Sequence, residues 1–247
     1  MLSSSNPVTL SGRPGDSRVL LLDNHLLVVS KRRGVLVQGD VTGDMDLLSQ
    51  ARDFLKHRFN KPGNVFVGLV HRIDRPASGI VVLARTSKAA DRLSSQFRER
   101  TIRKIYVAIV EGRLSGEGAC KGYIVKEDRH PKLVPADVPG AKFASLSWRA
   151  CPVSNQRSVV SVDLHTGRPH QIRLQLSDLG HPIVGDLRHG AQSEFDGRNL
   201  ALHASEIVFK HPTRDERVRV SDPPENWGAD IEAAISGLGY PGPSVTN

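Results

Sequence analysis

The apolar residues of this 247-residue chain gather in short β-branched runs, which are separated by polar turns that contain glycine and proline. The central example is the stretch 65–85, VFVGLVHRIDRPASGIVVLAR, in which two such runs flank a cluster of charged residues. Runs of this length and composition are typical of buried strands. We therefore predict strands over 65–70 and 80–83, joined by a polar turn.

Further apolar runs predict additional strands along the chain, and the strands over 143–149 and 158–164 are expected to form a hairpin. Residues 114–140 have mixed charge and many glycines and prolines, so they predict only a short strand near Tyr123. The remaining predicted strands cover 18–22, 26–30, 102–110, 143–149, 158–164 and 207–209.

Three segments place apolar residues at helical rather than alternating spacing. Residues 46–58 have one apolar face, and 87–100 form a second helix that Ser87 can cap, with basic residues on its outer face. In the third helix, Pro169 fits the first position and Gly180 the position just past the end. We expect one domain over 17–227, a flexible tail over 1–16 and a loosely held tail over 228–247.

The chain is basic, with 34 Lys and Arg against 26 Asp and Glu, a net charge of +8 and a pI near 9.8. Residues 71–104 contain nine of these cations and three acids. Such a balance suits an acidic polymer such as nucleic acid. The alternative interpretation is a solvated, charge-rich helix face.

Cysteine and histidine spacing argues against metal and disulfide sites. Cys120 and Cys151 form no CxxC pair and are too few for a disulfide framework. The spacing of His165, His170 and His181 matches no helical ligand pair, so we expect no metal. No secretory leader and no run of about 18 apolar residues is present, which predicts a soluble cytoplasmic protein.

Asp74 is the candidate reacting group, because it lies among His71, Arg72 and Arg75 in the central turn. Nearby positive charge favours the ionised form of a carboxyl group. The alternative is an ion pair that only joins two strands. Further on, the loop 165–168 precedes the third helix and suits a phosphate or a carboxylate. Arg173 lies too early in that helix to favour its dipole, so we expect it to have an anionic partner.

Three segments together resemble a known family. HRIDRPASG at 71–79 resembles the HRLDRxTSG motif of the RluA-type pseudouridine synthases, with Ile for Leu and Ala for Thr. IRKIYVAIV at 102–110 and HTGRPHQIRLQLSDLGHPIVGD at 165–186 resemble the second and third motifs of that family. The resemblance extends from about Arg18 to Trp227, although Arg32 stands where the family usually has proline.

The resemblance implies an α+β fold, in which a mixed, mostly antiparallel central sheet of two halves carries flanking helices and an RNA-binding cleft. It implies three catalytic residues: Asp74 as the reacting carboxylate, Arg173 as its ionic partner, and Tyr106, which stacks on the uracil and can take the proton from carbon 5. The substrate-binding residues that it implies are His71, Arg72, Arg168 and Ile172.

The implied activity is the isomerisation of uridine to pseudouridine in an rRNA or tRNA stem-loop. The implied enzyme uses no cofactor and no metal, lacks the N-terminal RNA-binding domain of many relatives and acts as a monomer. Two other classes are an RNA-binding module without catalysis and a metal-dependent hydrolase. The presence of Asp74, Tyr106 and Arg173 argues against the first, and the absence of metal-ligand spacing argues against the second.

Overall fold

One twelve-stranded sheet forms the body of the protein in the computed structural model, which describes residues 8–12, 16–127, 130–197, 199–239 and 242–246. The strand order is β1-β2-β4-β10-β5-β9-β8-β6-β7, while β3 pairs with β4, β11 with β10 and β12 with β11. Among the described strands, only β4 and β10 pair in parallel. The predicted mixed, mostly antiparallel sheet is therefore confirmed.

The bounds of the elements follow the chain in order. The strands are β1 (Arg18–Leu22), β2 (Leu26–Lys31), β3 (Gly68–Leu69), β4 (Ser78–Ala84), β5 (Arg103–Glu111), β6 (Gly116–Glu127), β7 (His130–Val134), β8 (Lys142–Pro152), β9 (Arg157–Leu164), β10 (Leu202–Lys210), β11 (Arg217–Ser221) and β12 (Ser244–Thr246). The helices are α1 (Leu47–Arg58), α2 (Ser87–Glu99), α3 (Gln171–Asp178), α4 (Ala229–Gly237) and the short 3-10 helix η1 (Leu187–His189).

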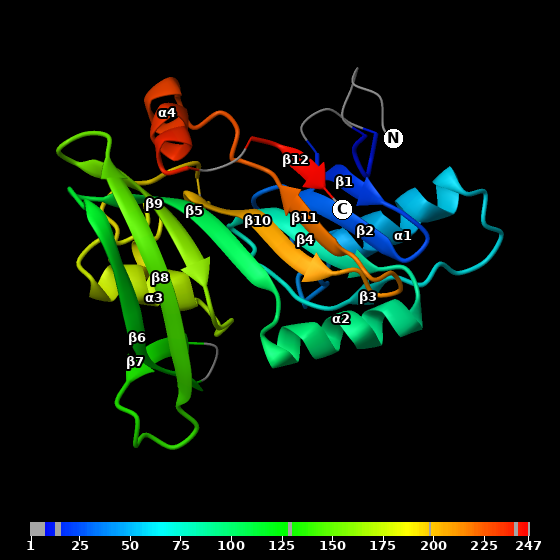
Figure 1. The fold of residues 1–247 in the computed structure, drawn as a ribbon, viewed down its shortest axis with the longest axis horizontal. Helices are drawn as coiled ribbons and strands as arrows, with labels where there is room; N and C mark the ends of the chain where they lie inside the picture. The colour runs from blue at the N-terminus through cyan, green and yellow to red at the C-terminus, as the bar shows by residue number, and fades with distance from the viewer. Residues whose placement is uncertain (1–7, 13–15, 128–129, 198, 240–241, 247) are drawn as a thin grey trace.

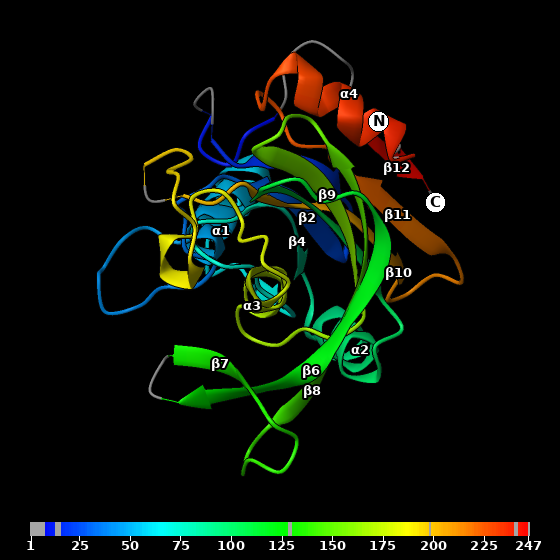
Figure 2. The same cartoon turned by 90° about the vertical axis from the view of Figure 1, so that its left-hand side faces the viewer.

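The sheet has two halves that meet where β5 pairs with β10 (Figure 1). One half carries α1 and α2, and the other curves around α3, as Figure 2 shows. Strands β2 and β4 are buried on both faces, because Leu27 and Val81 pack in the α1 core while Leu26 and Ile80 pack in the α2 core. Burial on both faces explains why these strands are continuous apolar runs. Among the described residues, no helix is long and apolar enough to cross a membrane.

Several predicted boundaries were wrong. Of the strand expected over 65–70, only Gly68 and Leu69 pair with β4. Helix α2 is capped by Thr86 rather than Ser87, since the Thr86 hydroxyl accepts a hydrogen bond from the Ala89 N–H at 3.2 Å. Helix α3 begins after His170, whose φ of 51° is left-handed, so Pro169 lies outside the helix.

The prediction also missed β7 and all of β6 except a short strand near Tyr123, whereas β8 matches the strand expected over 143–149. Strand β6 is twelve residues long, and it pairs with β8 over the nine positions 116–124. Its sequence, GEGACKGYIVKE, contains three glycines, and only Ile124 and Val125 are buried. Backbone pairing rather than apolar burial therefore defines this strand, which leaves little signal in the hydrophobic pattern.

Both chain ends contact the body of the protein where they are described. The predicted flexible tail 1–16 falls partly on residues 1–7 and 13–15, which lie outside the described residues. The Val8 carbonyl accepts a hydrogen bond from Val19 N–H, and Leu10 is buried. At the other end, the segment expected to be loosely held forms α4 and β12, and Ile235 of α4 is buried in the core.

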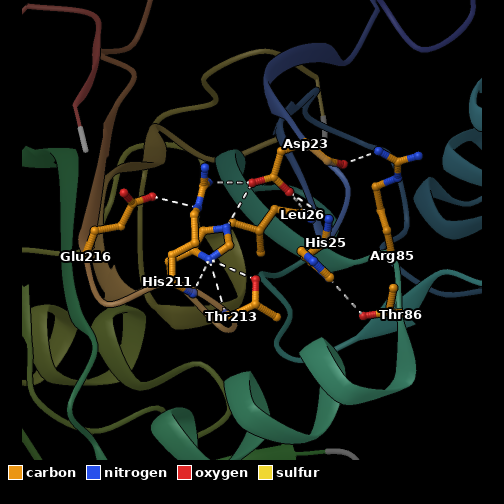
Figure 3. Close-up of polar contacts among 9 residues, drawn as sticks. Asp23, His25, Leu26, Arg85, Thr86, His211, Thr213 and Glu216 are labelled. Carbon is orange, nitrogen blue, oxygen red and sulfur yellow. Dashed lines mark hydrogen bonds and ion pairs between the residues drawn. The ribbon is translucent and has the colours of Figure 1, made fainter.

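A hydrogen-bonded cluster joins the β1–β2 turn to the β10–β11 turn (Figure 3). One oxygen of Asp23 accepts hydrogen bonds from the N–H groups of His25 and Leu26, both at 2.7 Å. The other accepts from His211 Nε2 at 2.9 Å and from Arg214 Nη2 at 2.8 Å. Burial alone would raise the pKa of Asp23, but these hydrogen bonds hold that pKa below its ordinary value. The ionised Asp23 therefore fixes two turns that are distant in sequence.

Candidate active site

A pocket of about 510 Å³ lies where the two halves of the sheet meet. Its walls come from the loop before β4, the end of α2, strand β5 and the segment that leads into α3. The structure thus brings together side chains from all three sequence motifs. The predicted site residues that line it are His71, Arg72, Asp74, Tyr106, Arg168, Ile172 and Arg173.

Asp74 lies in the loop before β4, where a tight turn is closed by a hydrogen bond from Ala77 N–H to the Asp74 carbonyl at 3.1 Å. The loop continues into Gly79, which has a φ of 111° and pairs with Ala204 of β10. A Cβ at position 79 would lie 2.3 Å from the Ala204 carbonyl oxygen, so only glycine permits this approach. The start of β4 is therefore fixed against β10, and with it the position of Asp74.

Lys31 supports the same loop from beneath and was missed by the sequence analysis. Its side chain is 1% exposed, and its ammonium lies 2.7–3.1 Å from four backbone carbonyl oxygens, those of Arg32, Val35, Arg75 and Ala77. Burial lowers the pKa of Lys31 to about 7, while the Asp74 charge opposes that shift. The alternation of side chains in β2 could have identified Lys31 as inward-facing, because it lies on the same face of the strand as the buried Leu27 and Val29.

Arg173 holds two carboxylates rather than the single one that was predicted. Its Nη1 lies 3.2 Å from Asp74 Oδ2, which confirms the expected contact. Its Nε and Nη2 form a bidentate pair with Asp186 at 2.6 and 2.7 Å. Asp186 is 1% exposed and Arg173 is 7% exposed, whereas Asp74 is 31% exposed. Asp186 therefore anchors the guanidinium, and Asp74 meets its solvent-facing edge.

Asp186 is the second residue that sequence reasoning missed. It ends the third motif, GHPIVGD, but no pattern in the sequence showed that it would reach back to α3. Burial alone would lower the pKa of Arg173, but Asp186 first and Asp74 second raise it. The guanidinium is therefore charged at every pH at which the protein is folded, and it presents a fixed positive charge to Asp74.

Tyr106 and Ile172 line the pocket from β5 and from the first turn of α3. Tyr106 is 9% exposed and Ile172 is 4% exposed, so both are held by the core. Burial, and then the negative charge of Asp74, raise the pKa of Tyr106. Its phenol is therefore protonated at neutral pH, and the pocket offers an aromatic ring and an aliphatic side chain beside one carboxylate.

His71 anchors the loop as well as lining the pocket. Its Nε2 accepts a hydrogen bond from Val82 N–H at 2.9 Å, and its ring stacks on Phe97 at 4.5 Å between centroids. Burial, and then the charge of Lys104, lower the pKa of His71 to about 3. The imidazole is therefore neutral, with its proton on Nδ1.

We predict that His71 makes folding sensitive to acid. Between pH 6.5 and about 3 the unfolded chain protonates this histidine and the folded protein does not, so stability falls as pH falls. The maximum slope is about 1.4 kcal/mol per pH unit. His71→Gln keeps an acceptor for Val82 N–H but cannot titrate, so its unfolding free energy should depend less steeply on pH in urea titrations. Equal slopes for both proteins would contradict the prediction.

Arg72 and Arg75, which flank Asp74 in the sequence, make different contacts. Arg72 is exposed and lines the pocket, whereas Arg75 donates to the Gly34 carbonyl at 3.0 Å and pairs with Asp44 at 2.5 Å. Arg168 lines the pocket and donates through Nε to the Phe143 carbonyl at 2.9 Å. The guanidinium of Arg75 is thus used to hold the loop.

The three histidines that raised the question of a metal do not share one site. His170 Nδ1 lies 3.0 Å from His189 Nε2, and His181 Nδ1 donates a hydrogen bond to the Glu111 carbonyl at 2.8 Å. His165 contacts the hydroxyl groups of two serines on β8. Within the described residues, no group of three or more metal-binding side chains is present.

Known proteins share sequence similarity with most of this chain. The sequence model described as RNA pseudouridylate synthase matches residues 25–178. An uncharacterised RNA pseudouridine synthase of Bacillus subtilis is 32% identical over 213 residues, which cover 85% of this chain and 69% of that protein. The ribosomal large subunit pseudouridine synthase C of Vibrio cholerae is 31% identical over 220 residues, which cover 87% and 67%.

The fold agrees as well. The human RNA pseudouridylate synthase domain containing 4 superposes with a TM-score of 0.72 at 21% identity, over 92% of this chain and 94% of that one. A likeness at that identity supports the architecture alone. The sequence matches carry the assignment, since the family model covers more than half of the chain and two relatives exceed 30% identity. The chain belongs to the RNA pseudouridylate synthase family and is of the RluA type.

Proposed function

We propose that Asp74 is the catalytic carboxylate with which this protein converts uridines of structured RNA into pseudouridine. One observation carries the proposal. Among the described residues that line the pocket, Asp74 is the only carboxylate, and its partner Arg173 is itself fixed by Asp186. A carboxylate that is paired with an anchored guanidinium is held in a fixed orientation, which is what geometry-sensitive catalysis requires.

The reaction breaks the bond between ribose and base nitrogen, turns the uracil and joins its carbon 5 to the same sugar carbon. The substrate holds every atom of the product, so the reaction needs neither a cofactor nor an energy source. A carboxylate can attack the anomeric carbon or remove a proton from the neighbouring ribose carbon. Both routes need the Asp74 carboxylate beneath the sugar, and its contact with Arg173 at 3.2 Å would hold it there.

The base would lie between Tyr106 and Ile172. Aromatic stacking tolerates any orientation of the ring about its normal, which suits a base that must turn within the pocket. Removal of the proton from carbon 5 by Tyr106 would need a phenolate, which burial and the Asp74 charge disfavour. The role that the geometry supports for Tyr106 is therefore a stacking surface. Asp74, once free of the sugar, is the carboxylate available for that proton.

The target nucleotide would leave its stack to enter the pocket, because the reacting atoms are hidden inside an RNA helix. Arg72 and Arg168, at the pocket, would hold its phosphates, and His71 would shape the wall beside them. We propose an rRNA or tRNA stem-loop as the substrate, residues 17–227 as the catalytic domain, and a cytoplasmic monomer as the active form.

We predict that the purified protein forms pseudouridine in unmodified transcripts of rRNA and tRNA, with EDTA present and no cofactor added. No step of the reaction needs a Lewis acid, so chelation should leave the rate unchanged. Carbodiimide mapping of pseudouridine would locate the modified positions. Transcripts that gain no pseudouridine, or turnover that EDTA stops and zinc restores, would overturn the proposal.

A further inference from the structure

Lys104 reaches the pocket from β5 but has no role in the chemistry described above. It lies two residues before Tyr106, so both side chains leave the same face of the strand, and both line the pocket. Within the described residues it forms no hydrogen bond and no ion pair closer than 4.0 Å. Burial, and then the charge of Arg100, lower the pKa of Lys104 to about 8, against the opposing effect of Asp163. A largely buried ammonium without an acceptor is costly unless something else supplies one.

Two arginines surround this lysine. Arg100 ends α2 with a left-handed φ of 59° and lines the same pocket. Arg168 comes from the loop before α3, and its Nε is held by the Phe143 carbonyl. The charge of Arg100 lowers the pKa of both Lys104 and Arg168, so Arg100 repels each of these two side chains. We call Arg100, Lys104 and Arg168 the cationic cluster.

No acid of the pocket neutralises the cationic cluster. Asp74, the sole carboxylate among the described lining residues, is paired with Arg173. Arg103, the neighbour of Lys104, does form an ion pair. Its side chain lies on the other face of β5, and its Nε lies 3.0 Å from Asp163 Oδ2. Among the described residues, Arg103 thus has an ion-pair partner within 4.0 Å, whereas Arg100, Lys104 and Arg168 have none. An anion from outside the chain would relieve that repulsion.

We propose that the cationic cluster binds a backbone phosphate group of the RNA beside the target uridine. The inference rests on the proposed function for the identity of the RNA. Residues two apart in a strand are separated by roughly 6–7 Å. A base stacked on Tyr106 therefore places the phosphate of the same or the adjacent nucleotide within reach of Lys104. Gly167 completes the site, because a Cβ there would lie 3.8 Å from Lys104 Nζ, so the loop backbone borders the ammonium.

The test compares Lys104→Met with the parent protein, using a fluorescein-labelled oligouridylate as the probe. Removing one phosphate contact should weaken binding about tenfold. The slope of log K against log salt should become shallower by about 0.7. In turnover assays on unmodified rRNA and tRNA transcripts, the loss should appear in KM more than in kcat. Lys104→Arg, which keeps the charge, should retain the parental slope.

Arg103→Met is the matched control, since it removes the same charge one residue away on the opposite face of β5. Its affinity and its salt slope should equal those of the parent. Equal slopes for Lys104→Met and the parent would overturn the proposal, as would a loss confined to kcat at saturating RNA. Thermal melting establishes that each variant is folded. If the parent makes no pseudouridine but the slopes still differ, the proposed function fails while the phosphate site stands.

Discussion

Asp74→Asn is expected to lower pseudouridine formation by roughly three or more orders of magnitude. The amide is nearly the size of the carboxylate, but it neither attacks the sugar nor removes a proton from it. RNA binding should persist, because its affinity comes from lysine and arginine contacts with phosphates. The salt dependence of binding should equal that of the parent protein. Single-turnover assays on unmodified transcripts and parallel binding titrations provide the two measurements.

The structure also predicts that Asp74→Asn leaves the protein stable. From the sequence, with Asp74 as the only partner of Arg173, the loss of the pair would cost about 3–5 kcal/mol if the pair were buried. Arg173 in fact keeps its bidentate pair with Asp186, and Asp74 is 31% exposed. The expected cost is therefore about 1 kcal/mol or less. A folded variant that still forms pseudouridine at nearly the parental rate would refute the role of Asp74, and one that no longer binds RNA would make Asp74 a residue that organises the pocket.

The convergence of the three motifs was implied by their resemblance to one family, while the residues themselves indicated only that Asp74 is a candidate reacting group and that Arg173 needs an anionic partner. The central turn held a carboxylate, and the third motif held a cation at a helix start where the dipole opposes it. The structure brings Asp74 and Arg173 to 3.2 Å, and Tyr106 lines the same pocket. A charged side chain that lacks a partner in its own segment can be recognised from the sequence without knowledge of the fold.

The supporting residues could not be predicted in the same way. Lys31 ends a buried strand, and only the position of the loop above it supplies the four carbonyl oxygens that it contacts. Asp186 reaches Arg173 across a turn whose course is set by tertiary packing. Strand β6 and helix α4 were missed for a related reason, since their stability comes from pairing and docking on the rest of the protein. The pattern of a single sequence indicates secondary-structure propensity and hydrophobic periodicity, but it does not indicate contacts between distant segments.

Asp186→Asn is expected to destabilise the protein more than Asp74→Asn does. Asp186 is 1% exposed, and both of its oxygens accept from Arg173 at 2.6 and 2.7 Å. Asparagine would place an NH₂ group against a guanidinium that only donates, and Arg173 would remain buried with one partly exposed counter-charge. We expect the free energy of unfolding to fall by about 3–5 kcal/mol. Urea titrations would measure this change.

A matched control is available in the same part of the chain. Asp196 is 66% exposed and lies 3.8 Å from Arg33, so Asp196→Asn should change the free energy of unfolding by about 0.5 kcal/mol or less. Activity separates the two roles further. In Asp186→Asn, Arg173 would lose its anchor, and Asp74 would lose a fixed partner, so the folded fraction should also turn over more slowly. If Asp186→Asn is as stable and as active as the control, then Asp74 alone suffices to hold Arg173. In that case the proposed roles of the two carboxylates, structural for Asp186 and catalytic for Asp74, would be wrong.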